Sequence, residues 1–97
     1  MAQLVTIVSG TVPPERVTDV QDEYERSVAD RLPPGLERTF LLQSEPGVIA
    51  IASVWRDRAA LEAMIATGQE PLARRLIREA GGTPEPAFYD VIASATA

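Results

Sequence analysis

Few side chains in this chain could carry out acid–base or nucleophilic chemistry, because four of the usual residue types are absent. The 97 residues contain no His, Cys, Lys or Asn. The absence of His removes the usual general base, and the absence of Cys removes thiolate nucleophiles and zinc–thiolate sites. Without Lys, Schiff-base chemistry is excluded as well. Any reaction must therefore use carboxylates, hydroxyls, Tyr, Trp, Arg or the backbone.

Three aromatic residues are the first candidates for a ligand site. Trp55 ends an apolar segment, where it either lines a ligand cavity or closes the hydrophobic core. Tyr24 and Tyr89 also lie among apolar residues, and a buried Tyr needs a hydrogen-bond partner. Each hydroxyl could polarise a substrate oxygen, or each ring could anchor the core with its hydroxyl at the surface. The sequence leaves both alternatives open.

The charged candidates are one aspartate and one arginine cluster. Asp90 lies inside an apolar segment. It is either a buried general base or a charge on an edge strand that prevents aggregation. Arg74, Arg75 and Arg78 could bind a phenolate or carboxylate if one of them faced inward, but such clusters are typical of a solvated helix face.

The overall charge excludes several classes of partner. The net charge is −5, which argues against nucleic acid and anionic membrane surfaces. No segment has the roughly 20 apolar residues of a membrane span, and the first residues lack the features of a signal peptide. We therefore expect a cytoplasmic protein.

Asp19, Asp22 and Glu23 are adjacent on a polar helix face, which is typical of solvated surface, so we expect no metal site.

Hydrophobic periodicity and turn residues predict six main elements in a single domain over residues 1–97. Apolar runs predict strands over 3–12, 36–44, 48–55 and 87–94. A helix beginning at Pro14 is ended by Pro33-Pro34-Gly35, and Asp57 is the expected N-cap of a helix that Gly68 ends. A further short helix runs from Pro71 to Gly81. The order predicts an α+β fold, the ferredoxin-like βαββαβ plait, with a four-stranded antiparallel sheet and helices on one face.

The predicted strands are apolar on both faces. In the strand over 48–55, Val48, Ala50, Ala52 and Val54 share one face, and the residues between them are also mostly apolar. A sheet with one face in water would alternate apolar and polar residues. We therefore expect a homodimer through the sheet face opposite the helices, which would close a dimeric α/β barrel. The alternative is a monomer with a few exposed aliphatic residues.

The sequence resembles the antibiotic biosynthesis monooxygenase family of dimeric α/β barrels. The resemblance is carried by Pro34-Gly35-Leu36 and by Ser53-Val54-Trp55-Arg56-Asp57-Arg58-Ala59-Ala60-Leu61, in which Trp55 matches the pocket Trp of the family. It implies oxygenation of an anthrone-type polyketide to a quinone without metal or flavin. In that chemistry the substrate loses a C–H proton, and its anion reacts with oxygen in a dry pocket.

Two departures from the family pattern narrow what the resemblance implies. Haem-degrading members use an Asn and a His, where this chain has Thr6 or Val8 and an apolar helix segment at Met64. We therefore do not expect haem degradation. Quinone-forming members often have a polar group where this chain has Ile51.

Taken together, these features predict a small dimeric protein that holds an aromatic or apolar molecule between helices and sheet. If it is an enzyme, we expect a cofactor-independent monooxygenase acting on an aromatic, polyketide-like substrate. The alternatives are a non-catalytic barrel that binds a small apolar ligand, and a cyclase or isomerase for which Asp90 with a Tyr would supply acid and base. The expected pocket residues are Trp55, Ile51, Tyr24, Phe40, Met64 and Tyr89.

Overall fold

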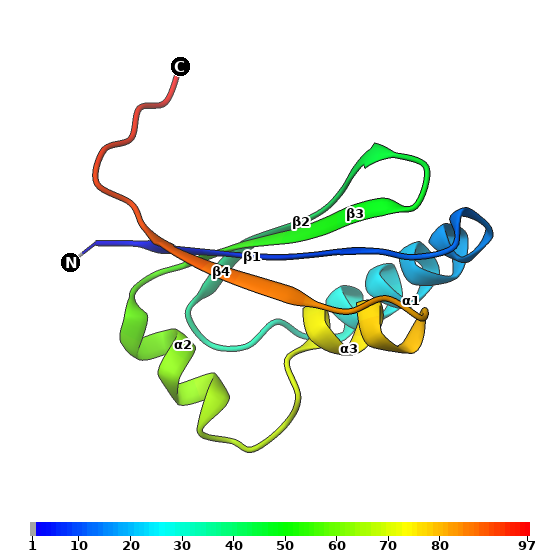
Figure 1. Ribbon diagram of the computed structural model, residues 1–97. Helices are drawn as coiled ribbons and strands as arrows, with labels where there is room; N and C mark the ends of the chain where they lie inside the picture. The colour runs from blue at the N-terminus through cyan, green and yellow to red at the C-terminus, as the bar shows by residue number, and fades with distance from the viewer. Residues whose placement is uncertain (1) are drawn as a thin grey trace.

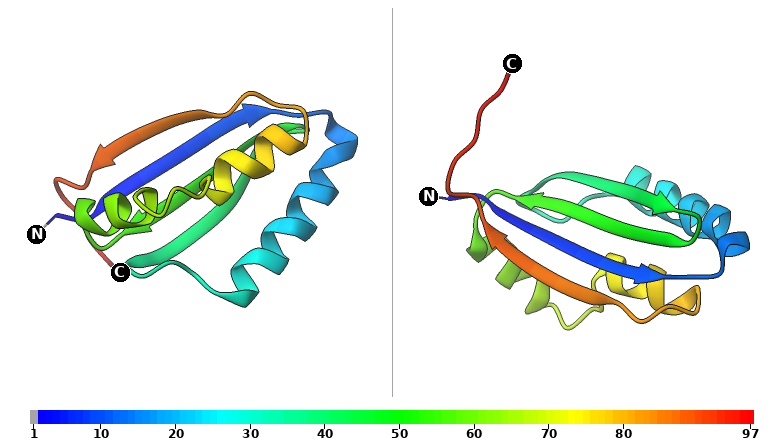
Figure 2. Two further views of the ribbon diagram at one scale, coloured as in Figure 1. Left: turned by 90° about the horizontal axis from the view of Figure 1, so that it is seen from below. Right: turned by 45° about the horizontal axis from the view of Figure 1, so that its top comes forward.

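The computed structural model describes residues 2–97 as four strands and a set of helices (Figure 1). The strands and helices follow in the order β1 (Leu4–Thr11), η1 (Pro14–Arg16), α1 (Val17–Asp30), β2 (Leu36–Glu45), β3 (Val48–Trp55), α2 (Arg58–Ile65), α3 (Leu72–Glu79) and β4 (Glu85–Asp90). The sheet order is β2-β3-β1-β4, and every neighbouring pair is antiparallel. All helices cover one face of the sheet (Figure 2). The predicted ferredoxin-like plait is confirmed.

The last strand differs from its predicted bounds. It begins earlier, at Glu85, and includes Pro86, which an edge strand tolerates because its missing N–H would have no ladder partner. It ends at Asp90 because β1, its partner, begins at Leu4, and one further bond joins Val91 N to Gln3 O at 2.9 Å. Residues 91–97 then extend away from the sheet, on the side opposite the helices in Figure 1.

A tight turn at Pro46 and Gly47 joins β2 to β3, and Pro followed by Gly is the pair that a type II turn favours at its two central positions. Gly47 has φ of 86°, the left-handed conformation that the second central position of a type II turn requires. A Cβ at this position would lie 2.4 Å from the carbonyl oxygen of Val12, so the turn also packs closely against the end of β1. Only glycine can adopt this φ and also leave room for the carbonyl oxygen of Val12.

A β-bulge in β2 changes which side chains share a face. Leu36 pairs with Trp55 and Arg38 pairs with Val54, so Glu37 is an extra residue on β2. Leu36 therefore faces the helices, while Phe40 faces the opposite side, where it is 38% exposed. Strict alternation along β2 would place Leu36 and Phe40 on the same face, and the extra residue separates them.

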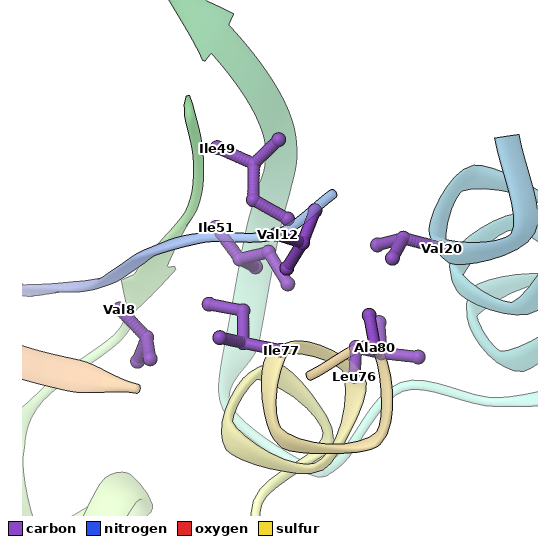
Figure 3. Packing of buried hydrophobic residues seen from close by; sticks show 8 residues of the cluster. All are labelled: Val8, Val12, Val20, Ile49, Ile51, Leu76, Ile77 and Ala80. Carbon is purple, nitrogen blue, oxygen red and sulfur yellow. The ribbon is translucent and has the colours of Figure 1, made fainter. Parts of the chain in front are cut away.

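The main core lies between the sheet, the first turns of α1, and α3. It is made entirely of aliphatic side chains: Val8, Val12, Val20, Ile49, Ile51, Leu76, Ile77 and Ala80 (Figure 3). Ile77 is fully buried, and Gly10 lets α3 approach closely, because a Cβ on Gly10 would lie 2.6 Å from Cγ2 of Ile77. This end of the sheet is closed by packing. None of the helices formed by residues 2–97 has the length and apolar character needed to cross a membrane.

Candidate functional site

A cavity of about 630 Å³ lies between the helices and the sheet. Its lining includes part of a linker over residues 66–71, which divides the segment after β3 into two helices, α2 and α3. Gly68 in this linker has φ of 80°, which ends the helical path, and the linker bows away from the sheet in Figure 1. The volume is within the range of small-molecule pockets, about 300–1,000 Å³.

One transverse row of the sheet crosses the floor of the cavity. Thr39 on β2 pairs with Ser53 on β3, which pairs with Thr6 on β1, which pairs with Phe88 on β4. All four line the cavity. We call Thr39, Ser53 and Thr6 the hydroxyl row. It places three hydroxyl groups side by side beneath mainly apolar walls.

Two aromatic side chains bond to the hydroxyl row from its two ends. The indole Nε1–H of Trp55 donates to Oγ1 of Thr6 at 3.2 Å, and this hydrogen bond is buried. The hydroxyl of Tyr24 on α1 donates to Oγ1 of Thr39 at 3.3 Å, and Ser53 Oγ donates to the same oxygen at 3.4 Å. The network fixes the orientation of both rings relative to the floor.

Four of the six predicted pocket residues line the cavity, namely Trp55, Ile51, Tyr24 and Met64. The two alternatives for Trp55 are both realised, because it is 4% exposed, packs against Leu4 and Leu61, and still forms part of the wall. Tyr24 directs its hydroxyl to the floor and not to the surface. Whether these residues bind a substrate remains a prediction.

The other two predicted pocket residues, Phe40 and Tyr89, lie on the opposite face of the sheet. Phe40 is there because of the bulge, and Tyr89 is there because it pairs with Val5, whose side chain also faces away from the helices. Arg38 lies over the ring of Phe40, 4.9 Å from its centroid. The expectation that these two rings line the same cavity is therefore wrong. Phe88, the neighbour of Tyr89, takes the inward position.

The hydroxyl row was not predicted as part of the site. Ser53 and Thr6 were detectable from the sequence, because each has the same strand phase as buried neighbours and interrupts an otherwise apolar face. Thr39 was not detectable in this way, because the bulge at Glu37 shifts its phase. A polar residue on an otherwise apolar, buried strand face therefore indicates a candidate site residue.

Charged groups lie at the rim of the cavity. Nε of Arg78 donates to Glu70 of the linker at 3.0 Å, and this guanidinium holds the pKa of Glu70 below its ordinary value. Arg75 pairs with Glu79 at 3.2 Å and lies 3.7 Å from Glu23. Two members of the predicted arginine cluster, Arg75 and Arg78, are therefore engaged in surface ion pairs. Among residues 2–97, no group of three or more His, Cys, Asp or Glu side chains could hold a metal ion.

Asp90 lies outside the cavity. Its carboxylate is 62% exposed on edge strand β4 and accepts a bond from Arg58 at 3.2 Å. The edge-strand alternative therefore describes it, and the buried-base alternative is wrong. Tyr89, the adjacent residue, points to the other face of the sheet, so the two cannot serve as an acid–base pair in the cavity.

Comparison with known proteins shows similarity at the level of structure alone. No protein-family model and no curated protein sequence matches the chain. A mutant of SnoaB, a cofactor-independent oxygenase from Streptomyces nogalater, is 23% identical over 95% of each chain, with a TM-score of 0.70. A putative antibiotic biosynthesis monooxygenase from Caulobacter crescentus is 17% identical over 95% of this chain and 92% of that chain, with a TM-score of 0.72.

A haem-degrading protein from Mycobacterium tuberculosis has the same architecture. It is 18% identical over 99% of this chain and 98% of that chain, with a TM-score of 0.71. At these identities the similarity shows a shared fold. The predicted resemblance to antibiotic biosynthesis monooxygenases is thus confirmed for the fold.

Proposed function

We propose that this chain binds a planar aromatic molecule with phenol or ketone oxygens in the cavity and oxygenates it without a cofactor. The observation that carries the proposal is a cavity of about 630 Å³ whose walls are mostly apolar and whose floor is a row of hydroxyls. The apolar walls favour a flat ring system, and the hydroxyls favour oxygen substituents on one edge of it. The shared fold with SnoaB, described as a cofactor-independent oxygenase, supports the same reaction class.

The proposed reaction needs little from the protein. An anthrone-type CH₂ group loses a proton to water, and the resulting anion reacts with O₂. One oxygen atom becomes the new carbonyl, the other leaves as water, and the CH₂ carbon supplies the electrons. Hydroxyl donors directed at the substrate oxygen would stabilise the anion on which this sequence depends.

Oxygen uptake on addition of anthrone, in the presence of a metal chelator, tests this proposal. We expect uptake above the rate without protein, and a decrease of about tenfold or more in Trp55→Phe, which loses the bond to Thr6. The unfolded protein and the protein-free reaction give the baseline. Anthrone that binds in the cavity without any uptake above this baseline would contradict the oxygenase.

One observation favours a second candidate, a small-molecule binding protein without catalysis. The hydroxyl row consists of neutral groups, so the floor itself supplies no strong base. Saturable binding of anthrone with no oxygen uptake would support this candidate. The cyclase or isomerase alternative is not proposed, because Asp90 lies outside the cavity.

We also propose that a second copy of the chain covers the open sheet face. Phe40, Leu42, Val48 and Tyr89 on this face are 38%, 48%, 37% and 56% exposed. Apolar patches of this kind are rare on monomers, and the equivalent face of a second copy would match them. A cytoplasmic location remains a prediction.

Light scattering after gel filtration tests the dimer. We expect twice the chain mass for wild type and the monomer mass for Leu42→Arg, because an unpaired charge would be buried in the interface. A wild-type chain that is monomeric at micromolar concentration would contradict the proposal.

A further inference from the structure

The hydroxyl row has more donors than its own acceptors use. Thr6, Ser53, Thr39, Tyr24 and the indole of Trp55 carry five donor hydrogens between them. Three hydrogen bonds link these groups. Within residues 2–97, two hydroxyl hydrogens are therefore left without a side-chain acceptor.

The direction of the bond to Thr6 is fixed by chemistry. An indole N–H can only donate, so Oγ1 of Thr6 must be the acceptor from Trp55. The hydrogen of Thr6 must then point elsewhere, and its side chain is 8% exposed and lines the cavity. The Thr6 hydroxyl hydrogen is therefore available to donate to an oxygen in the cavity that Thr6 lines.

The second free hydrogen belongs to the Tyr24, Ser53 and Thr39 trio. These three hydroxyls share two hydrogen bonds, so one hydrogen remains whichever way the bonds are directed. Ser53 is the register neighbour of both threonines, and adjacent strands are about 4.8 Å apart. An oxygen above Ser53 is therefore within reach of donors from both sides.

We propose that the hydroxyl row, with Thr6 as the principal donor, binds one oxygen of an aromatic ligand and favours its anionic form. This inference rests on the proposed occupant of the cavity and names the residues that distinguish a phenolate or enolate from the neutral molecule. Hydrogen bonds to a charged oxygen are roughly twice as strong as those to a neutral one. Loss of a donor therefore weakens binding of the anion more than binding of the neutral form.

Charged groups at the rim affect the same equilibrium in both directions. Asp30 and Arg31 at the end of α1, Glu70 of the linker, and Arg74 and Arg75 of α3 line the cavity. Substitutions in the hydroxyl row leave these groups unchanged. A comparison of variants therefore isolates the contribution of the hydroxyls.

The test uses 2-hydroxyanthraquinone, a planar phenol whose visible absorption changes when it ionises and which is already at the quinone oxidation level. Its ionisation is titrated when bound to wild type, Thr6→Val, Thr6→Ser and Thr18→Val. We expect the bound phenol to ionise about one pH unit higher in Thr6→Val than in wild type, which is a tenfold loss for the anion, or about 1.4 kcal/mol. Thr6→Ser, which keeps the hydroxyl, should restore the wild-type midpoint, and exposed Thr18→Val should not change it.

The outcomes separate this inference from the proposed function. A probe that binds all four proteins with the same ionisation midpoint overturns the role of the hydroxyl row and leaves cavity binding intact. A probe that fails to bind wild type overturns the inference together with the proposed occupant. A purely structural role for Thr6 would change the affinity for both forms equally, so the midpoint would not move.

Discussion

The two ends of the helix-covered sheet face differ in how they are filled. At the α3 end, the face is closed by eight buried aliphatic side chains, of which Ile77 is one. At the α2 end, Leu4 and Trp55 pack against Ala60 and Leu61, and the cavity lies between this small cluster and the main core. The same sheet face therefore provides both a core and a candidate binding site.

This difference gives one small sheet face both a closed core and a cavity. The transverse row through Val8 and Ile51 is apolar and belongs both to the main core and to the cavity lining, while the row through Thr6 and Ser53 is polar. The helical segment after β3 is interrupted at Gly68, beside the cavity. The polar residues of the floor and the break between α2 and α3 lie beside the same cavity. Two separate parts of the sequence, the strands and the linker, therefore contribute to it.

The largest effect should come from deleting packing at the closed end. Ile77→Ala removes a fully buried side chain and should lower the free energy of unfolding by about 3–4 kcal/mol. Met64→Ala, beside the cavity, removes a half-buried side chain next to existing space and should lower the free energy of unfolding by roughly 1 kcal/mol. Denaturant unfolding monitored by Trp55 fluorescence measures both. Equal costs would show that the two ends are packed alike.

Two glycine substitutions compare the same two regions, and each should lower the free energy of unfolding by less than Ile77→Ala does. Gly10→Ala places a methyl group against Ile77 at the closed end and should cost about 1–3 kcal/mol through overpacking. Gly68→Ala meets no atom within 4 Å, so only the left-handed backbone opposes it, at about 1 kcal/mol. Thermal unfolding of both variants provides the measurement. A Gly68→Ala variant that is less stable than Gly10→Ala would contradict this assignment of causes.

The smallest effect should come from the ion pair between Glu70 of the linker and Arg78 of α3. The pKa of Glu70 is lowered from 4.5 chiefly by its hydrogen bond to Arg78, so the pair stabilises the fold above that pH. This stability is lost as the pH falls below 4.5 and through the lower folded-state pKa, because Glu70 is then protonated. The pH dependence of the unfolding midpoint should be weaker in Glu70→Gln.

A double-mutant cycle provides the control for this pair. In an Arg78→Gln background, Glu70→Gln should have no further effect on the acid dependence. An unchanged acid dependence in Glu70→Gln alone would show that other carboxylates account for it.

The fold was predictable from the sequence because its signals are local. Pro-Gly at the β2–β3 turn, Asp57 as a helix cap and Gly68 as a helix end all occupy the expected places, and Asp57 accepts a hydrogen bond from Ala60 N at 2.9 Å. The sequence of β3 also shows directly that both faces of this strand are mostly apolar. Each of these features needs only neighbouring residues to be interpreted.

The site was predictable only in part because it depends on which way strands face. Phe88 and Tyr89 are both aromatic, so the sequence cannot say which one points inward until the pairing with β1 is known. Phe40 and Thr39 exchange their expected roles because of one extra residue at Glu37. Strand phase is set by partners far away in the chain, whereas helix caps and turns are not.

The linker between α2 and α3 also bears on how quickly a ligand can come and go. Residues 66–70 are exposed, the linker lines the cavity, and Glu70 binds it to α3 through a surface ion pair. Displacement of this short surface segment would widen the cavity and leave the buried contacts of Ile77 in place. For the proposed ligand, we therefore expect exchange to be uncoupled from global unfolding, so that substitutions in the linker change residence time without changing global stability.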